Sequence, residues 1–215
     1  MRTYGDMCGI ARALDVIGER WALLVVRELI LGPKRFTDLR AGLPNIGPDV
    51  LSQRLRELEA AGLLRRRTLA PPAASRVYEL TERGHALEPV LLSLGEWGSA
   101  APIPPGDPPL GVDSTIIALR TLFDPSAAGD LAATFELRLG GQVFRARVGG
   151  GELELERGEA PEADATIVSD PWSLGGMLWQ GYAPEDAERA GDASLEGDRR
   201  AVARFLRLFP LPASG

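Results

Sequence analysis

Apolar residues recur at helical spacing through most of the first 100 residues. This period predicts a helix over 20–30 that stops before Gly32-Pro33, a second over 35–43, and a third that begins at Pro48 and ends at Gly62. The residues expected to face the core are Trp21, Leu24, Val25 and Leu29 in the first helix, Phe36, Leu39 and Leu43 in the second, and Leu51, Leu55 and Leu58 in the third.

The pattern then shortens to strand-like runs over 63–69 and 76–80, joined by the turn segment APPAAS, which favours a β-hairpin. Thr81 can cap a final helix with a kink at Pro89. Its expected apolar face is Leu87, Val90, Leu91, Leu94 and Trp97. Helices, a hairpin and a helix in this order are typical of a winged helix-turn-helix domain.

Five prolines in AAPIPPGDPPLGV, residues 100–112, block both helix and central strand and favour an extended spacer. We therefore predict a winged helix domain over 1–99, a Pro-rich linker over 100–112 and a second domain over 113–215. This second domain is expected to be α+β, with a helix carrying Ile116, Leu119 and Phe123 on one side.

Alternating apolar and polar residues follow in ATFELRL, QVFRARV and ELELER, which predict strands joined by glycine turns, and DATIVSD predicts another strand. Helices are expected in PWSLGGMLWQG and PEDAERAG. A short strand and a closing helix then place Val202, Phe205 and Leu208 or Phe209 inward. The fold class predicted for the whole chain is α+β.

Charge is unevenly distributed along the chain, whose net charge is -6. Residues 1–99 carry +2 and residues 100–215 carry -8, whereas residues 34–76 hold nine basic residues against four acidic ones. A local basic patch on an acidic protein suits a polyanionic partner, although the solvated face of a small domain has the same composition.

The helix that begins at Pro48 presents side chains that can read duplex DNA. Asp49, Gln53 and Arg56 point away from its leucine face and Ser52 lies on the flank. Arginine binds guanine and glutamine binds adenine bidentately, while serine and a helix N-terminus hold phosphate. The predicted DNA-binding residues are Lys34, Arg35, Pro48, Asp49, Ser52, Gln53 and Arg56, with Arg65, Arg66, Arg67 and Arg76 on the hairpin.

An ordinary amphipathic surface helix also directs polar residues outward. Arg54 turns back toward the core side, where Glu57 or Glu59 is within reach for an ion pair. The helix alone is therefore a weak indication of DNA binding, and the hairpin arginines together with the local charge strengthen it.

The motifs ALDVIGERW, GPKRFTDL, LSQRLRELE and LTERG, which follow Cys8 in this order, resemble the HxlR-type winged helix transcriptional regulators, relatives of the MarR regulators. The resemblance covers about Tyr4 to Trp97. It implies a homodimer on promoter DNA, with 48–61 as recognition helix, 65–80 as wing, and the dimer made by 8–18 and 82–98. Two copies predict an inverted-repeat operator.

Cys8 stands where many members of this family carry a cysteine that in some of them senses oxidants or electrophiles. Arg12, one turn later, can supply positive charge to such a thiol. A single cysteine beside an apolar helix is also often a small buried residue, and the chain has no second cysteine to form an internal disulfide.

The segments DATIVSDPWSLGGMLWQG and AGDASLEGD resemble the sterol carrier protein type two-like fold over about Val112 to Pro210. This resemblance implies a tunnel between sheet and helices for lipids or other apolar molecules, and hence an effector-binding domain. The candidate lining residues are Trp172, Leu178, Trp179, Tyr182 and Phe205, although aromatic residues at helical spacing more often belong to the core alone.

No catalytic constellation is visible, because the single histidine, His85, and the single cysteine form neither a metal cluster nor a triad. We expect no enzyme activity, no metal and no cofactor. The absence of an apolar leader and of a membrane-length run favours a soluble, cytoplasmic protein. Two functions stay open: a DNA-binding regulator that senses an apolar molecule, and a carrier of apolar ligands whose winged helix contacts other proteins.

Overall fold

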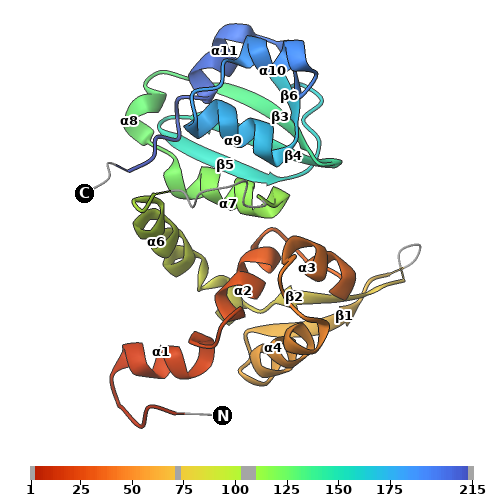
Figure 1. The fold of residues 1–215 in the computed structure, drawn as a ribbon, viewed down its shortest axis with the longest axis vertical. Helices are drawn as coiled ribbons and strands as arrows, with labels where there is room; N and C mark the ends of the chain where they lie inside the picture. Colours follow the sequence, from red (N-terminus) through yellow and green to blue (C-terminus); the bar gives the residue numbers. More distant parts are fainter. Residues whose placement is uncertain (1–2, 71–73, 103–109, 213–215) are drawn as a thin grey trace. The chain divides into compact units, whose positions relative to one another are not determined.

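The computed structural model describes residues 3–70, 74–102 and 110–212. The chain forms two compact units, unit 1 from Met1 to Leu91 and unit 2 from Leu92 to Gly215 (Figure 1). The boundary between these two units lies inside a helix, Glu88–Ser99. Most of the expected linker, residues 103–109, lies outside the described residues, so the division into 1–99, 100–112 and 113–215 stays a prediction.

Unit 1 is a helical domain with one hairpin. Its elements are α1 (Gly9–Ile17), α2 (Ala22–Ile30), α3 (Phe36–Gly42), α4 (Pro48–Ala60), β1 (Leu64–Thr68), β2 (Arg76–Leu80), α5 (Glu82–His85) and the start of α6 (Glu88–Ser99). The central helix α2 packs on α3, α4 and β2. The predicted helix-turn-helix is present as α3, residues 43–47 and α4.

Both predicted ends of α4 are confirmed. Pro48 occupies the first helical position, where its missing N–H leaves no backbone acceptor unpaired. After Ala60 the chain turns at Gly62, whose φ of +72° favours glycine, and the Leu63 N–H donates to the Leu58 carbonyl at 3.0 Å. The predicted core leucines of α4 are fully buried: Leu51, Leu55 and Leu58.

The expected buried face of α2 is partly wrong. Leu24 is 38% exposed, because at about 100° per residue it points away from the buried stripe. That stripe consists of Ala22, Val25, Val26, Leu29 and Ile30.

The single helix expected after the hairpin is two helices. Thr81 does cap a helix, since its hydroxyl accepts from the Gly84 N–H at 3.2 Å, but α5 ends at His85. The second helix, α6, begins at Glu88 with Pro89 in its first turn, a position that proline tolerates. The helix is therefore interrupted between His85 and Glu88, where a kink at Pro89 was expected.

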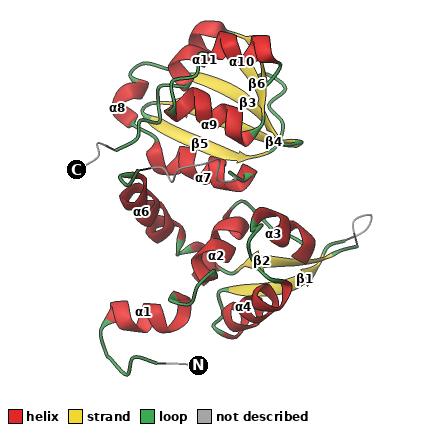
Figure 2. Ribbon diagram, in the orientation of Figure 1, coloured by secondary structure: helices red, strands yellow, loops and turns green. Residues whose placement is uncertain are grey.

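Unit 2 is an α+β domain with a five-stranded mixed sheet in the order β5-β4-β3-β6-β7, shown in yellow in Figure 2. Strands β3 and β6 are parallel and the other neighbours antiparallel. Its strands are β3 (Ala133–Leu139), β4 (Gln142–Gly149), β5 (Glu152–Arg157), β6 (Ala165–Ser169) and β7 (Ala193–Gly197), and its helices α7 (Val112–Leu122), α8 (Pro125–Ala128), α9 (Pro171–Trp179), α10 (Pro184–Ala190) and α11 (Arg199–Phe205).

The core of unit 2 is aromatic where α11 meets the sheet. The ring of Phe205 lies 4.5 Å from that of Phe135 and 5.1 Å from that of Phe209, measured between centroids. The inward positions predicted for the closing helix are therefore confirmed. Among the described residues, no helix is long and apolar enough to cross a membrane.

Asp170 fixes the start of α9, because its carboxylate accepts from the backbone N–H groups of Trp172 and Ser173 at 2.7 and 3.0 Å and from the Ser173 hydroxyl at 2.6 Å. Burial alone would raise the pKa of Asp170. These hydrogen bonds favour the carboxylate more strongly and hold the pKa below its ordinary value of 3.8.

We expect Asp170→Ala to lower the free energy of unfolding by about 1 kcal/mol through loss of this cap, measured by urea denaturation. Because the pKa is lowered in the folded state, the stabilisation is complete above 3.8 and is lost as the pH falls further. The difference between wild type and variant should therefore shrink in acid. Asp192→Ala, at an exposed position beyond α10, is the control, and an equal loss there would contradict a capping role.

Candidate nucleic-acid interface

The exposed face of α4 carries the side chains that sequence analysis assigned to base contacts. Asp49, Gln53 and Arg56 are all exposed, and Ser52 is half-buried beside them. The Gln53 amide donates to Glu57 at 2.9 Å, and Arg56 Nε donates to the Ser52 carbonyl at 3.3 Å. Both contacts stay on the surface of one helix, so the polar ends of these side chains are accessible to a ligand.

Arg54 does not belong to this face. Its side chain is buried, with the residue 7% exposed, and its guanidinium donates to Glu57. The alternative interpretation of Arg54 as an ion-pair partner within the helix is thereby confirmed for this residue, and the outward face of α4 keeps one arginine, Arg56.

The hairpin concentrates positive charge. Its strands are antiparallel with Arg66 opposite Tyr78, and residues 64–80 contain four arginines against one glutamate. Arg65 and Arg67 both bind that glutamate, Glu79, with N–O distances of 2.6 and 2.9 Å. Two cations share one anion, so a net positive charge stays on this pair of strands.

Arg66 connects the hairpin to α4. Its guanidinium lies 2.8 Å from Glu59 of α4 and 5.7 Å from the centre of the Tyr78 ring. These contacts fix the hairpin next to α4 and leave the Arg66 side chain half exposed. Arg76 at the start of β2 is exposed as well.

The two basic residues before α3 differ. Arg35 is exposed, but Lys34 is engaged by Glu28 at 2.7 Å, with only 12% of its side chain accessible. Glu28 itself is 1% exposed and also binds Arg27 at 2.8 Å. Sequence analysis missed this buried carboxylate, because nothing in the spacing of α2 marks Glu28 as different from a surface acid.

The comparison with known proteins decides the family. A model of the HxlR-like helix-turn-helix matches residues 16–103. The uncharacterised HTH-type transcriptional regulator YvaP of Bacillus subtilis is 37% identical over 95 residues, which are 44% of this chain and 88% of that protein. The chain belongs to the HxlR-like helix-turn-helix family.

Further HxlR-like relatives match the same part of the chain. The uncharacterised HTH-type transcriptional regulator YkvN of B. subtilis is 42% identical over 91 residues, covering 42% of this chain and 77% of that protein. The solved structure of the redox regulator HypR in its oxidised form has 38% identity and a TM-score of 0.41, covering 45% of this chain and 100% of that one. The family of transcription regulators is thus shown for unit 1, and most of unit 2 lies beyond the match.

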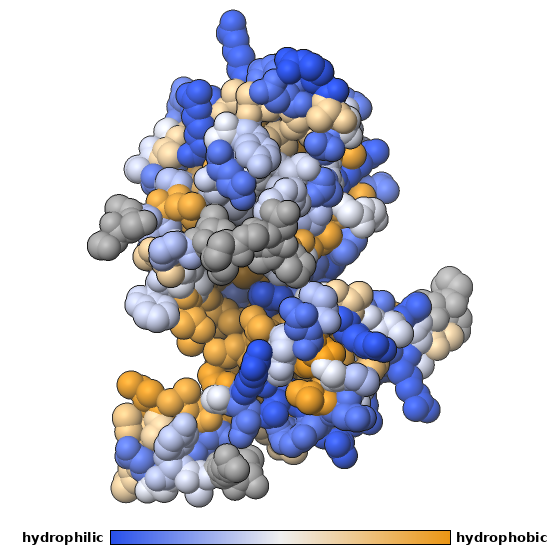
Figure 3. All heavy atoms as spheres, in the orientation of Figure 1, coloured by the Kyte–Doolittle hydropathy of each residue, from blue (hydrophilic) through white to orange (hydrophobic). Residues whose placement is uncertain are grey.

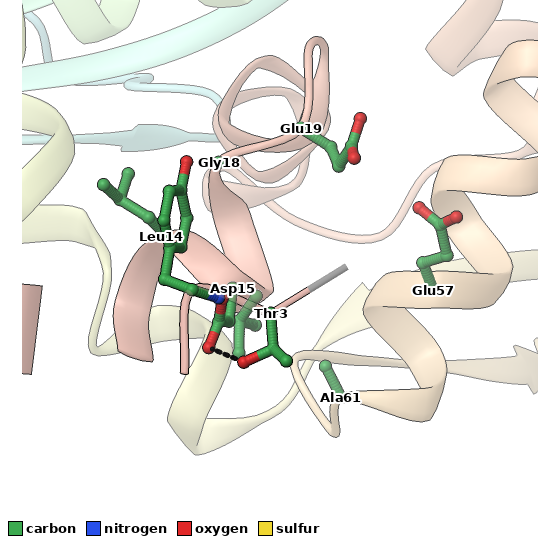
Figure 4. Close-up of a pocket in the computed structure, with 9 residues that line it drawn as sticks. Thr3, Leu14, Asp15, Gly18, Glu19, Glu57 and Ala61 are labelled. Carbon is green, nitrogen blue, oxygen red and sulfur yellow. Dashed lines mark hydrogen bonds between the residues drawn. The ribbon is translucent and has the colours of Figure 1, made fainter. Parts of the chain in front are cut away.

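The N-terminal helix of this HxlR-like chain packs loosely on its own unit. Only Ile17 of α1 is buried, and a hollow of about 370 Å³ separates α1 from α4. Figure 4 shows Glu19 and Glu57 facing this hollow, while the Thr3 hydroxyl donates to Asp15 at 2.9 Å. The apolar side of α1 is uncovered, with Ile10 73% exposed.

Helix α6 also leaves apolar side chains uncovered. Figure 3 shows hydrophobic surface, in orange, over α1 and over α6. Of the face predicted for the helix after the hairpin, Leu91 is buried and Leu87 half-buried. Val90, Leu94 and Trp97, which repeat at i, i+4 and i+7, are exposed.

Cys8 lies at the N-cap of α1 and is exposed with a free thiol. Its backbone N–H donates to the Asp6 carboxylate at 2.9 Å, and its carbonyl accepts from the Arg12 N–H at 3.0 Å. The burial expected for an ordinary structural cysteine is therefore wrong here. Among the described residues, no group of three or more His, Cys, Asp or Glu side chains is placed to hold a metal ion.

The residues predicted to line a ligand pocket in unit 2 separate into different environments. Trp172 and Trp179 line a cleft of about 270 Å³. Phe205 is fully buried in the aromatic core, and Tyr182 is exposed and packs on Gly176. Leu178 is half-buried outside the cleft lining, so two of the five predicted residues, both tryptophans, line this cleft, and a ligand role for any of the five stays a prediction.

Proposed function

We propose that this protein is a homodimeric transcription regulator that binds an inverted-repeat promoter site, with its C-terminal domain responding to an apolar small molecule. The observation that carries the proposal is the exposed Gln53 and Arg56 face of α4 beside an arginine-rich hairpin, in a chain of the HxlR-like family. In this proposal α4 is the recognition helix and β1–β2 is the wing.

In this proposal the outward side chains of α4 contact the base edges and give sequence specificity. An α-helix fits the major groove, where Arg56 can bind the O6 and N7 atoms of guanine and Gln53 the N6 and N7 atoms of adenine. Pro48, Asp49 and Ser52 lie at the N-terminal end of α4, whose unpaired backbone N–H groups suit a phosphate. Asp49 itself repels phosphate, which makes a base-edge donor such as the cytosine amino group its fitting partner.

The wing supplies contacts that do not depend on sequence. Arg65, Arg66 and Arg67 can exchange their carboxylate partners for phosphates, and the exposed Arg76 can bind a further phosphate, which releases counterions from DNA. Arg35 extends this basic surface. Lys34 is held back from DNA by its ion pair with the buried Glu28, because moving it to a phosphate would leave that carboxylate with one cation, Arg27, among the described residues.

Arg66→Ala should lower the affinity for specific and random duplexes by the same factor. It should also reduce the slope of log affinity against log salt concentration by about one, which corresponds to one phosphate contact. The reason is that a backbone contact carries no base preference. Fluorescence anisotropy of labelled duplexes over a salt series measures both quantities. A loss confined to the specific duplex would contradict a wing role.

The dimer is proposed to form through the uncovered apolar faces of α1 and α6. A soluble single chain rarely leaves Ile10, Val90, Leu94 and Trp97 exposed together on two helices unless a partner covers them. A second copy is the natural partner, because a two-fold interface places the same patch on both chains. The exposed α1 is also where Cys8 lies, which makes its thiol a candidate for redox sensing next to this interface.

Unit 2 is proposed to be the effector domain with a sterol carrier protein type two-like fold. Supporting this are the segments after β6 that resemble that fold and the mixed five-stranded sheet with helices α7, α10 and α11 against it. Catalysis is not part of the proposal, since the relatives of unit 1 are transcription regulators.

A DNase I footprint on the DNA upstream of the protein's own gene tests this function. Two protected half-sites of inverted sequence, with centres about 10 base pairs or a multiple of that apart, are the expected result for a dimer of recognition helices. A single protected site without inverted symmetry would contradict the dimeric arrangement, even if the protein binds DNA.

A further inference from the structure

The part of unit 2 where a ligand tunnel was expected is filled at the α11 side. Phe135 of the sheet, Phe205 of α11 and Phe209 are each almost completely buried and lie in a stack of ring contacts. The Phe123 ring extends the stack, 6.2 Å from that of Phe209. A ligand placed at Phe205 would have to displace this packing, so the site has to be sought elsewhere in the unit.

An open cleft of about 270 Å³ lies elsewhere in unit 2, with Trp172, Gly175 and Trp179 of α9 in its lining. Its walls come from the last turn of α6, from α7, from α9 and from the segment after α11, together with Ala101, Pro102, Leu110 and Gln180. The principal lining side chains are Ala118, Leu122, Trp172, Trp179 and Leu211. An apolar cavity of roughly 150 Å³ is enough for benzene, so this cleft suits a somewhat larger molecule such as a fused pair of rings.

The cleft favours a neutral ligand, because its lining contains no charged residue. The indole N–H of Trp179 donates to the Phe209 carbonyl at 3.0 Å, which fixes this ring and removes its donor from the site. Ser99 and Gln180 are the polar side chains in the lining. They allow one or two hydrogen bonds at the rim of an otherwise apolar surface.

The position of the cleft connects it with α6. Gly98 and Ser99, at the end of this helix, are part of the wall. One turn earlier, Gly95 packs so closely on α7 that an added Cβ would lie 3.1 Å from Thr121. Helix α6 begins in unit 1 and ends in unit 2, and its exposed residues Leu94 and Trp97 belong to the proposed dimer surface.

We propose that the cleft bounded by α6, α7 and α9 binds a neutral, apolar molecule of about two fused rings, and that its occupancy shifts α6 and thereby DNA affinity. The second half of this inference rests on the proposed function. The ligand would contact α6, the helix that carries the proposed dimer surface. It would change DNA affinity to the extent that it binds the DNA-binding conformation and the alternative conformation with different affinities.

The neutral naphthalene fluorophore Prodan is the probe for this site. We expect saturable binding at one site per chain, with a blue shift of Prodan emission and energy transfer from tryptophan. Ala118→Leu and Ser99→Leu fill the cleft from α7 and from α6, and each should weaken Prodan binding by about 10-fold or more. Two fillers on different helices keep the test valid if one of them fails to fold.

Ala203→Leu is the matched control, because Ala203 is an exposed residue of α11 outside the cleft. It should leave Prodan affinity unchanged. The inference is overturned if wild type does not bind Prodan, or if both folded fillers bind it as tightly as wild type.

The regulatory half is tested by titrating operator DNA with and without saturating Prodan. We expect a change in DNA affinity of about 5- to 150-fold, and by reciprocity the same factor in Prodan affinity when DNA is saturating. Unchanged DNA affinity with Prodan bound would overturn the coupling. Absence of DNA binding in all conditions would instead refute the proposed function. The fluorescence titration would still show whether the cleft binds Prodan.

Discussion

Leu94→Glu should give a monomeric protein whose affinity for its inverted-repeat operator is at least ~100-fold lower than that of wild type. Leu94 is exposed in the single chain and lies between Val90 and Trp97 on the uncovered face of α6. In a two-fold dimer the substitution places two like charges in an apolar interface, which is unfavourable through both desolvation and repulsion. A monomer engages one half-site and loses the second set of contacts.

Sedimentation velocity measures the oligomeric state and anisotropy the DNA affinity. Ser93→Glu adds the same charge to an adjacent exposed position of α6 and should leave the dimer intact. If Leu94→Glu stays dimeric and binds the operator normally, α6 is not the dimer surface. Equal dissociation of both variants would show an effect of charge alone and would also contradict the assignment.

Arg56→Ala is the second change with a large expected effect. It should weaken binding to the specific site by about 1–3 kcal/mol, roughly 5- to 150-fold, and relax the base preference at one position. Arg56 is the arginine that α4 keeps on its outward face, held by a single long contact to the Ser52 carbonyl. In the wild type, the Gln53 amide exchanges its contact with Glu57 for a base when DNA binds. Gln53→Ala should therefore lower specific affinity in the same way and relax the preference at a different base pair.

Binding to a set of duplexes, each with one altered base pair, measures this change of preference. Arg200→Ala removes an exposed arginine of α11 in unit 2 and should leave both affinity and preference as in wild type. The decisive quantity is the ratio of specific to random affinity. If Arg56→Ala and Gln53→Ala lower both affinities equally, α4 does not read bases.

Helix α4 was predictable because its signals are local. Pro48 at the start, Gly62 after the end and leucines at i, i+4 and i+7 depend only on neighbours within four turns of chain. The hairpin and the strands of unit 2 were predictable for the same reason, since alternation and glycine turns are local patterns. The outward position of Gln53 and Arg56 followed directly from the leucine face.

The pairing of charged groups was not predictable, because it depends on contacts between distant segments. Glu79 meets Arg65 and Arg67 only through the register of β1 and β2. The buried Glu28 is paired with Lys34, which the turn before α3 brings back onto α2. A sequence pattern counts Lys34 among the basic residues of a patch, whereas the fold uses it to neutralise a buried acid.

The ligand candidates show the same limit. In the sequence, Trp172, Trp179 and Phe205 are all aromatic residues in helical segments. Their packing in the structure distinguishes the two tryptophans, which line the cleft, from Phe205, which lies in the core. The contribution of Ser99 to the cleft wall had no signal in the sequence, since it depends on where α6 ends against α7 and α9. The close packing of α5 on the hairpin also had no signal in the sequence, since a Cβ added at Gly84 would lie 2.1 Å from the Leu63 carbonyl oxygen.

The most direct test of the central claim is the affinity of the purified protein for the DNA upstream of its own gene and for a random duplex. Measured at about 50 and 200 mM salt, binding should prefer the upstream DNA and fall steeply with salt for both duplexes, as expected for several phosphate contacts. Absence of binding to either duplex at the lower salt, with and without Prodan, would contradict a DNA-binding regulator and favour a carrier of apolar ligands.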